Sequence, residues 1–289
     1  MPNVRFLDAT DLAALWPPAE APDLLKSVLL KAGDGVGGIE WTADAARLPA
    51  AAGKAPAGSA ALLQGGTPSL LVDRAAFEAR RGAAVTGLVA RSLADPRSEV
   101  LTLLGCNATG RVVFEVVRAV FPDLERVLCF DPDVARQAAF ADEIMTTFNV
   151  ASIIPPEPRE ACEGAQILAS CPMPPPKAPV VEFDWLQRGT LVVMLHGASA
   201  FTDAMLQRAD RRLADDLAGW RAMAAAGRLT GVPEPEGDLA ALAAGRLPAR
   251  TGSPVIAAVC FGAPALDAAL AADLLARADK AGRGRTLAL

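Results

Sequence analysis

The segment from residue 99 to residue 171 alternates continuous apolar runs with helical patterns, and this alternation strongly constrains the fold. The runs are "EVLTLLG", "RVLCFD", "VASII" and "AQILASC"; the helical patterns include "GRVVFEVVRAVF" and "PDVARQAAFADEIMTTF". Strands that are apolar on both faces are typical of parallel sheets covered by helices. The sequence therefore predicts an α/β fold with a Rossmann-type doubly wound parallel sheet.

Composition limits the classes of protein to which the chain can belong. Hydrophobic residues make up 52% of the 289 residues, which is ample for a packed core, and the length favours two domains. The net charge is −5 without a basic run, so nucleic acids and anionic membranes are poor partners. No apolar stretch is long enough to span a membrane, and the first residues lack a targeting pattern, so we expect a cytoplasmic protein.

The stretch "LLGCNATG" matches a dinucleotide-binding turn except at one position. Gly105 and Gly110 take the first and last places of G-x-G-x-x-G, and Asn107 stands at the middle glycine. The turn follows a strand and opens a helix, so the N–H groups around Ala108 and Thr109 are expected to face a pyrophosphate. Asparagine tolerates positive φ better than most residues, so the turn can form, although the side chain crowds the phosphates.

Asp131 ends the next predicted strand, 21 positions after Gly110. An acidic residue at about this spacing commonly binds the adenosine ribose and favours NAD over NADP. The other interpretation is that Asp131 caps the following helix, with Pro132 in its first turn.

Two further strands are expected to end at the same edge of the sheet. One delivers Ser170 and Cys171, and the other delivers His196, followed by Ser199. His196 is the single histidine of a chain without tyrosine, so it is a candidate for proton transfer, or a histidine that satisfies a loop carbonyl. The five scattered cysteines fit neither a disulfide framework nor a metal site, and we expect buried free thiols.

The predicted helix "AAFEARRGAAVTGLVA" contains Arg80 and Arg81. Small residues follow Arg81, so a ligand can approach and its guanidinium can clamp a carboxylate. The alternative for Arg81, and the interpretation we prefer for Arg80, is a solvated helical arginine.

Several of these segments resemble the ornithine cyclodeaminase/mu-crystallin family. "RRGAAVTGLVARSLA" is similar to the family's R-T-(A/G)-A-x-S-A-L-A-A helix, with Arg81 at the substrate-carboxylate arginine, and "EGAQILASCP" and "FGAPALD" are similar to later motifs. "MLHGAS" is somewhat similar to L-H-x-S-L-R-D-L of N-(2-amino-2-carboxyethyl)-L-glutamate synthases, which implies a place in specialised metabolite biosynthesis.

The resemblance implies two domains and a homodimer. Residues 1–95 with 251–289 would form a smaller α+β substrate and dimerisation domain, and residues 96–250 the Rossmann dinucleotide-binding domain. It further implies an NAD-dependent enzyme acting on a small amino acid or its imine by oxidation, deamination, cyclisation or reductive condensation. In that enzyme Arg81 and His196 are catalytic, and Arg81 and Ser199 bind substrate. The predicted cofactor residues are Gly105, Asn107, Ala108, Thr109, Gly110, Asp131, Ser170 and Cys171.

The chain also departs from the family pattern. The lysine of the family's K-x-V strand has no clear counterpart, "HGASAF" lacks the cyclodeaminase aspartate, and the terminal K-S-x-G becomes "VCFG". Two alternatives therefore remain: a non-catalytic member that serves as a binding or partner protein, and a cofactor-independent condensing enzyme that uses Cys171 or His196.

Overall fold

The computed structural model describes residues 3–32, 39–45, 55–171, 181–195 and 200–288. The chain divides into two compact units, Met1–Arg81 with Ala263–Leu289, and Gly82–Gly262. In the described part of the chain, no helix combines the length and apolar character needed to cross a membrane.

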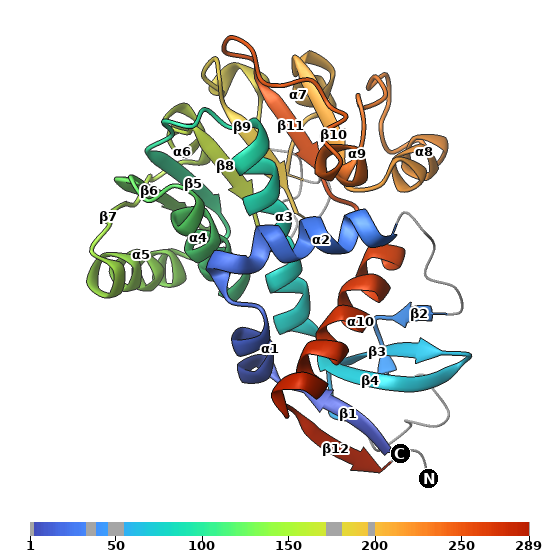
Figure 1. Cartoon of the computed structure of the whole chain (residues 1–289). Helices are drawn as coiled ribbons and strands as arrows, with labels where there is room; N and C mark the ends of the chain where they lie inside the picture. The colour runs from blue at the N-terminus through green and yellow to red at the C-terminus, as the bar shows by residue number, and fades with distance from the viewer. Residues whose placement is uncertain (1–2, 33–38, 46–54, 172–180, 196–199, 289) are drawn as a thin grey trace. The chain divides into compact units, whose positions relative to one another are not determined.

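The larger unit is built on a seven-stranded, wholly parallel sheet in the order β10-β11-β9-β8-β5-β6-β7 (Figure 1). Renumbered in chain order within the unit and read from the β7 edge, the strands are 3-2-1-4-5-7-6. The chain adds strands outward in one direction from β5 to β7 and then in the opposite direction from β8, so the strand order reverses between β5 and β8, as in doubly wound nucleotide-binding folds. The predicted fold class is confirmed. The strands are β5 (Val100–Leu104), β6 (Arg126–Phe130), β7 (Ala151–Ile153), β8 (Ile167–Ser170), β9 (Leu191–Met194), β10 (Arg211–Ala214) and β11 (Ile256–Val259).

Helices connect these strands and supply much of the larger unit's core. β5, β8, β9 and β11 are buried along their whole length, as their continuous apolar sequences predict. Helix α4 packs against β5, and α6 packs against β5 and β6. The helices are α4 (Ala108–Val120), α5 (Val134–Phe148), α6 (Pro158–Glu163), η3 (Phe183–Trp185), α7 (Asp203–Arg208), α8 (Leu217–Ala225) and α9 (Leu239–Ala243).

The smaller unit contains a five-stranded mixed sheet in the order β12-β1-β4-β3-β2. Only β1 and β4 pair in parallel, and the other neighbours are antiparallel. Helix α10 packs on β2 and β3 and also contacts α1 and α2. The elements are β1 (Asn3–Leu7), α1 (Ala9–Leu15), η1 (Pro18–Glu20), α2 (Ala21–Ala32), β2 (Ile39–Thr42), β3 (Ser59–Gln64), β4 (Thr67–Asp73), α10 (Pro264–Ala281) and β12 (Arg285–Ala288), while α3 (Arg74–Leu93) runs from this unit into the larger one.

Two predicted domain bounds need a correction. We assigned residues 1–95 to the smaller domain, but the first segment of the smaller unit ends at Arg81. We assigned residues 251–289 to the smaller domain, but β11 lies within this range and pairs with β9 and β10 of the parallel sheet. The apolar side chains of β11 are buried, and its backbone groups pair with the neighbouring strands of the larger sheet. The chain returns to the smaller unit only at Ala263. The division into two domains otherwise stays a prediction.

Candidate functional site

The turn after β5 requires glycine at two positions. Gly105 has φ of +107°, and a Cβ there would lie 3.2 Å from both Cβ and O of Cys171. At Gly110, in the first turn of α4, a Cβ would lie only 2.5 Å from the carbonyl oxygen of Gly105. The N–H of Gly105 donates to the Phe130 carbonyl at 2.8 Å, which ties the turn to the end of β6. The turn is therefore tight and held on both sides.

Asn107 does not adopt the positive φ that its type would tolerate. Its φ is −138°, and its side-chain oxygen accepts hydrogen bonds from the N–H groups of Thr109 at 3.0 Å and Gly110 at 3.2 Å. It is the N-cap of α4, a role for which asparagine is among the best residues. The middle glycine of the pattern is thus replaced by a cap on the N–H groups that a phosphate would use.

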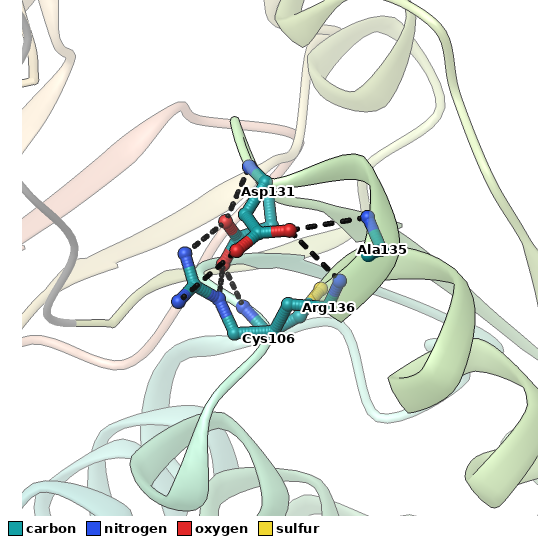
Figure 2. A network of polar contacts seen from close by, with 5 residues as sticks. Cys106, Asp131, Ala135 and Arg136 are labelled. Carbon is teal, nitrogen blue, oxygen red and sulfur yellow. Dashed lines mark hydrogen bonds and ion pairs between the residues drawn. The ribbon is translucent and has the colours of Figure 1, made fainter.

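Asp131 lies at the end of β6 with a side chain that is 1% exposed. Its carboxylate accepts from the N–H of Cys106 and the N–H of Asp133, both at 2.9 Å, and from Nε and Nη2 of Arg136 at 3.0 and 2.7 Å (Figure 2). Burial by itself would raise the pKa of Asp131, but these hydrogen bonds outweigh it and hold the pKa below its usual value. The carboxylate is therefore ionised at neutral pH and bridges the glycine turn to α5.

The alternative interpretation of Asp131 as a helix cap is wrong. Helix α5 begins at Val134, and its N-cap is Asp133, whose side chain accepts from the N–H groups of Ala135 and Arg136. Asp131 is unavailable to the helix because its carboxylate is drawn inward by the Cys106 N–H and by Arg136.

Ser170 and Cys171 lie at the end of β8, on the other side of β5. The Cys171 N–H donates to the Leu104 carbonyl at 2.8 Å, and both residues are buried. Burial raises the pKa of the Cys171 thiol to about 12, so a nucleophilic thiolate is scarce at neutral pH. All five cysteines are buried and none forms a disulfide, as expected.

In the smaller unit, Arg81 forms an ion pair that the sequence analysis did not anticipate. Its Nη1 lies 3.0 and 3.1 Å from the two carboxylate oxygens of Asp267, in the first turn of α10. The side chains are 14% and 12% exposed, so Arg81 is not a solvated arginine. Nor is Arg80 fully solvated, because its Nη1 donates to the Trp16 carbonyl at 2.8 Å and its side chain is partly buried.

The structure brings together only some of the predicted site residues. Gly105, Asn107, Gly110 and Asp131 surround the turn, with Ala108 exposed and Thr109 half-buried in the first turn of α4. His196 and Ser199 lie outside the described residues. Among the described residues, no group of three or more His, Cys, Asp or Glu side chains could hold a metal ion.

Sequence reasoning missed four polar residues: Asp133, Arg136, Asp215 and Asp267. Asp215 directly follows β10 and accepts from the N–H groups of Phe261 and Gly262 after β11 at 3.1 and 2.7 Å. Asp133 stands directly before a helical pattern, which is a usual cap signal. Nothing local marks the partners of Arg81 and Asp215, which are 186 and about 46 positions away.

Sheet order, turn and helix together define a Rossmann-type protein with a second α+β unit. The family model for the ornithine cyclodeaminase/mu-crystallin family matches residues 61–252, and the chain belongs to this family. The resemblance seen in the sequence is confirmed.

The individual proteins that the chain resembles share at most about a quarter of their aligned residues with it. The chain is 25% identical over 150 residues to N-((2S)-2-amino-2-carboxyethyl)-L-glutamate dehydrogenase of Staphylococcus aureus, a match that spans 52% of this chain and 44% of that relative. Among solved structures, it is similar to Thermococcus litoralis Δ1-pyrroline-2-carboxylate reductase in complex with NADH and L-proline, with a TM-score of 0.78, 18% identity and coverage of 98% and 99% of the two chains. It is also similar to an archaeal alanine dehydrogenase dimer with bound NAD, with a TM-score of 0.77, 18% identity and 99% coverage of both chains. At such identities the two structures show the fold alone.

Proposed function

We propose that this protein is an NAD-dependent oxidoreductase, or a cyclodeaminase-like lyase, that acts on a small amino acid or its imine. The observation that carries the proposal is the turn of residues 105–110. This turn leads from β5 into α4, at the point where the strand order of the sheet reverses between β5 and β8. Ligands of doubly wound sheets bind at this point, outside the carboxyl ends of the strands. The two similar structures described above, the reductase solved with NADH and the alanine dehydrogenase solved with NAD, support a nicotinamide cofactor.

The residues of the turn fit a dinucleotide. Gly105 and Gly110 have no side chain, and this lets the turn pack closely on the first turn of α4, the arrangement that brings backbone N–H groups to a pyrophosphate in dinucleotide-binding folds. The N–H groups of Thr109 and Gly110 are capped by the neutral amide of Asn107. A phosphate oxygen is a charged acceptor and forms the stronger hydrogen bond, so it can take these N–H groups from the amide.

Bound NAD would supply the acceptor or donor of a hydride at the substrate carbon. Arg81 would bind the substrate's carboxylate. Within the described part of the chain its contacts to Asp267 all involve Nη1, which leaves Nη2 and Nε for a second carboxylate. His196 would hold or move a proton at the substrate nitrogen, and Ser199 would bind the substrate.

The test is ligand binding followed by turnover, both on the full chain. NAD⁺ should raise the unfolding temperature, because a ligand at 100 times its Kd stabilises the folded state by about 2.7 kcal/mol. A panel of small amino acids should then produce NADH, and the matching imines should consume it. Gly110→Ala is the control for the turn, because its Cβ would lie 2.5 Å from the Gly105 carbonyl oxygen and would displace the turn that is proposed to hold the pyrophosphate. A protein that shows no thermal shift at millimolar NAD⁺ contradicts the proposal.

A non-catalytic family member is the second candidate. The missing counterparts of the family lysine and aspartate favour it. Such a protein would bind NAD⁺ yet turn over nothing in the panel. The third alternative, a cofactor-independent enzyme with Cys171 as nucleophile, is less well supported, because burial raises the pKa of that thiol to about 12. Full activity of NAD-stripped protein would favour it.

We also propose that the protein is a homodimer, since the similar archaeal alanine dehydrogenase is a dimer. Light scattering coupled to size-exclusion chromatography of the full chain tests this. A mass near twice that of the 29.8 kDa chain is expected, and a single-chain mass contradicts the proposal.

A further inference from the structure

The carboxylate of Asp131 already has a full set of hydrogen bonds. An ionised carboxylate offers about four lone-pair positions, and four N–H groups occupy them: Oδ2 accepts from Cys106 N and Arg136 Nε, and Oδ1 from Asp133 N and Arg136 Nη2. With only 1% of the side chain exposed, a ribose hydroxyl could bind Asp131 only by displacing one of these donors. Asp131 thus connects the glycine turn to the start of α5 through its hydrogen bonds to Cys106 N and Arg136.

Asp133, two residues further on, has the opposite character. Its side chain is 50% exposed. Oδ1 accepts both capping hydrogen bonds, from Ala135 N and Arg136 N at 3.1 Å. Oδ2 has, among the described residues, only a long ion-pair contact of 3.7 Å to Arg136 Nη1. The accessible carboxylate oxygen after β6 therefore belongs to Asp133.

The local charge favours a hydroxyl over a phosphate. Two carboxylates, Asp131 and Asp133, face one guanidinium, so the cluster carries a net charge of −1 at neutral pH. Arg136 directs Nε and Nη2 at Asp131 and Nη1 toward Asp133, which leaves it poorly placed to bind a further anion. A 2′-phosphate would meet repulsion here, whereas a 2′-hydroxyl can donate to the open oxygen.

We propose that Asp133, and not Asp131, is the carboxylate that selects the adenosine ribose of the dinucleotide. It accepts from the 2′-hydroxyl of NAD and repels the 2′-phosphate of NADP, while Asp131 and Arg136 are positioning residues that fix the start of α5 beside the glycine turn. This inference rests on the proposed function, because it concerns the same nucleotide site.

The decisive variant is Asp133→Asn. Asparagine is as good an N-cap as aspartate, so α5 should remain intact while the charge is lost. The matched control is Asp216→Asn: Asp216 is the N-cap of α8 and follows the edge strand β10, away from the switch point. Asp131→Asn tests whether Asp131 positions the start of α5 or selects the cofactor, because it removes the negative charge that pairs with Arg136.

The measurement is the Kd of NAD⁺ and of NADP⁺ by calorimetry on the full chain. Wild type should prefer NAD⁺, and Asp133→Asn should shift the ratio of the two Kd values toward NADP⁺ by about tenfold or more, the effect expected of one charge near a phosphate. Asp216→Asn should leave the ratio unchanged. Asp131→Asn should lower the Tm and weaken the binding of both ligands, and it should shift the ratio less than Asp133→Asn, because the Asp131 carboxylate is buried and already fully hydrogen-bonded.

Two results overturn the inference in distinguishable ways. If Asp133→Asn leaves the ratio unchanged, or if the ratio changes only in Asp131→Asn, then Asp133 does not select the cofactor although the proposed function stands. If wild type binds neither NAD⁺ nor NADP⁺, the proposed function fails and the selection fails with it.

Discussion

Gly110→Ala tests whether the turn is as tight as the structure indicates. The added Cβ would lie 2.5 Å from the Gly105 carbonyl oxygen, whereas close C–H···O contacts have carbon–oxygen distances of about 3.3–3.6 Å. Something must therefore move by roughly 1 Å. The oxygen is a main-chain atom, so no side-chain rotation relieves the clash. Gly105 is also held by its hydrogen bond to Phe130 and by its φ of +107°.

The expected cost follows from two opposing effects. Alanine in place of glycine in a helix is favourable by up to about 1 kcal/mol. Forcing an atom into a packed site costs about 1–3 kcal/mol, and occasionally more. Because the clash is with a main-chain atom that cannot move easily, we take a packing cost of about 3 kcal/mol. Subtracting about 1 kcal/mol for the helix preference of alanine leaves a net destabilisation of about 2 kcal/mol. For a unit as large as Gly82–Gly262 this lowers the Tm by about 4–8 °C.

Thermal and urea denaturation of the full chain measure this change, and Gly219→Ala provides the control. Gly219 is the third residue of α8 after the cap Asp216, just as Gly110 is the third residue of α4 after the cap Asn107. A Cβ at Gly219 would lie 3.3 Å from the Oδ2 atom of Asp216, a side-chain atom that needs to move by only a few tenths of an ångström, so this variant should be close to neutral. Equal stability of the two alanine variants would refute the reasoning.

Four further changes test other contacts. Asn107→Gly should tighten NAD⁺ binding in calorimetry, because it frees two capped N–H groups, and it should cost only a few tenths of a kcal/mol of stability. Asp131 has a lowered pKa, so its contribution is present above its unfolded pKa of about 3.9 and is lost as the pH falls through its folded value. The difference in urea midpoint between wild type and Asp131→Asn should therefore shrink between about pH 6 and about pH 3. Asp267→Ala should lower the free energy of unfolding by up to about 3 kcal/mol, because Arg81 keeps a largely buried charge without this partner; an unchanged value contradicts the pair. Cys171, with a thiol pKa raised to about 12 by burial, should react with a thiol reagent at about pH 8 far more slowly in the native than in the urea-unfolded protein.

The parts of the fold that the sequence predicts are those specified by local pattern. The strand "VLTLL" is buried at every position, as a continuous apolar run between helices requires. The helix after "LLGC" begins where the turn pattern predicts, because its cap and its glycines all lie within residues 105–110. Fold class and turn were therefore accessible without the structure.

The parts that escape prediction depend on residues far apart in the chain. β12 is a short, mostly exposed strand whose place is set by pairing with β1 at the opposite end of the sequence, with Asn3 opposite Ala288. The pair of Arg81 and Asp267 joins α3 to α10 across 186 positions. In "DPD" both aspartates can cap a helix on local grounds; only the approach of the Cys106 N–H turns Asp131 inward and leaves the cap to Asp133.

The same distinction explains the asparagine in the glycine turn. Only Gly105 needs a positive φ, and Gly110 needs the absence of a side chain, whereas position 107 is extended, a conformation that any residue adopts. The replacement at Asn107 therefore leaves the backbone of the turn intact and changes what lies at the start of α4. An amide oxygen now occupies the N–H groups of Thr109 and Gly110, as a neutral stand-in for a phosphate oxygen. Because a charged acceptor makes a hydrogen bond roughly twice as strong as a neutral one, binding of a pyrophosphate should proceed with rotation of the Asn107 side chain. For the proposed dinucleotide, we therefore expect the departure from the glycine pattern to lower the affinity without removing the site.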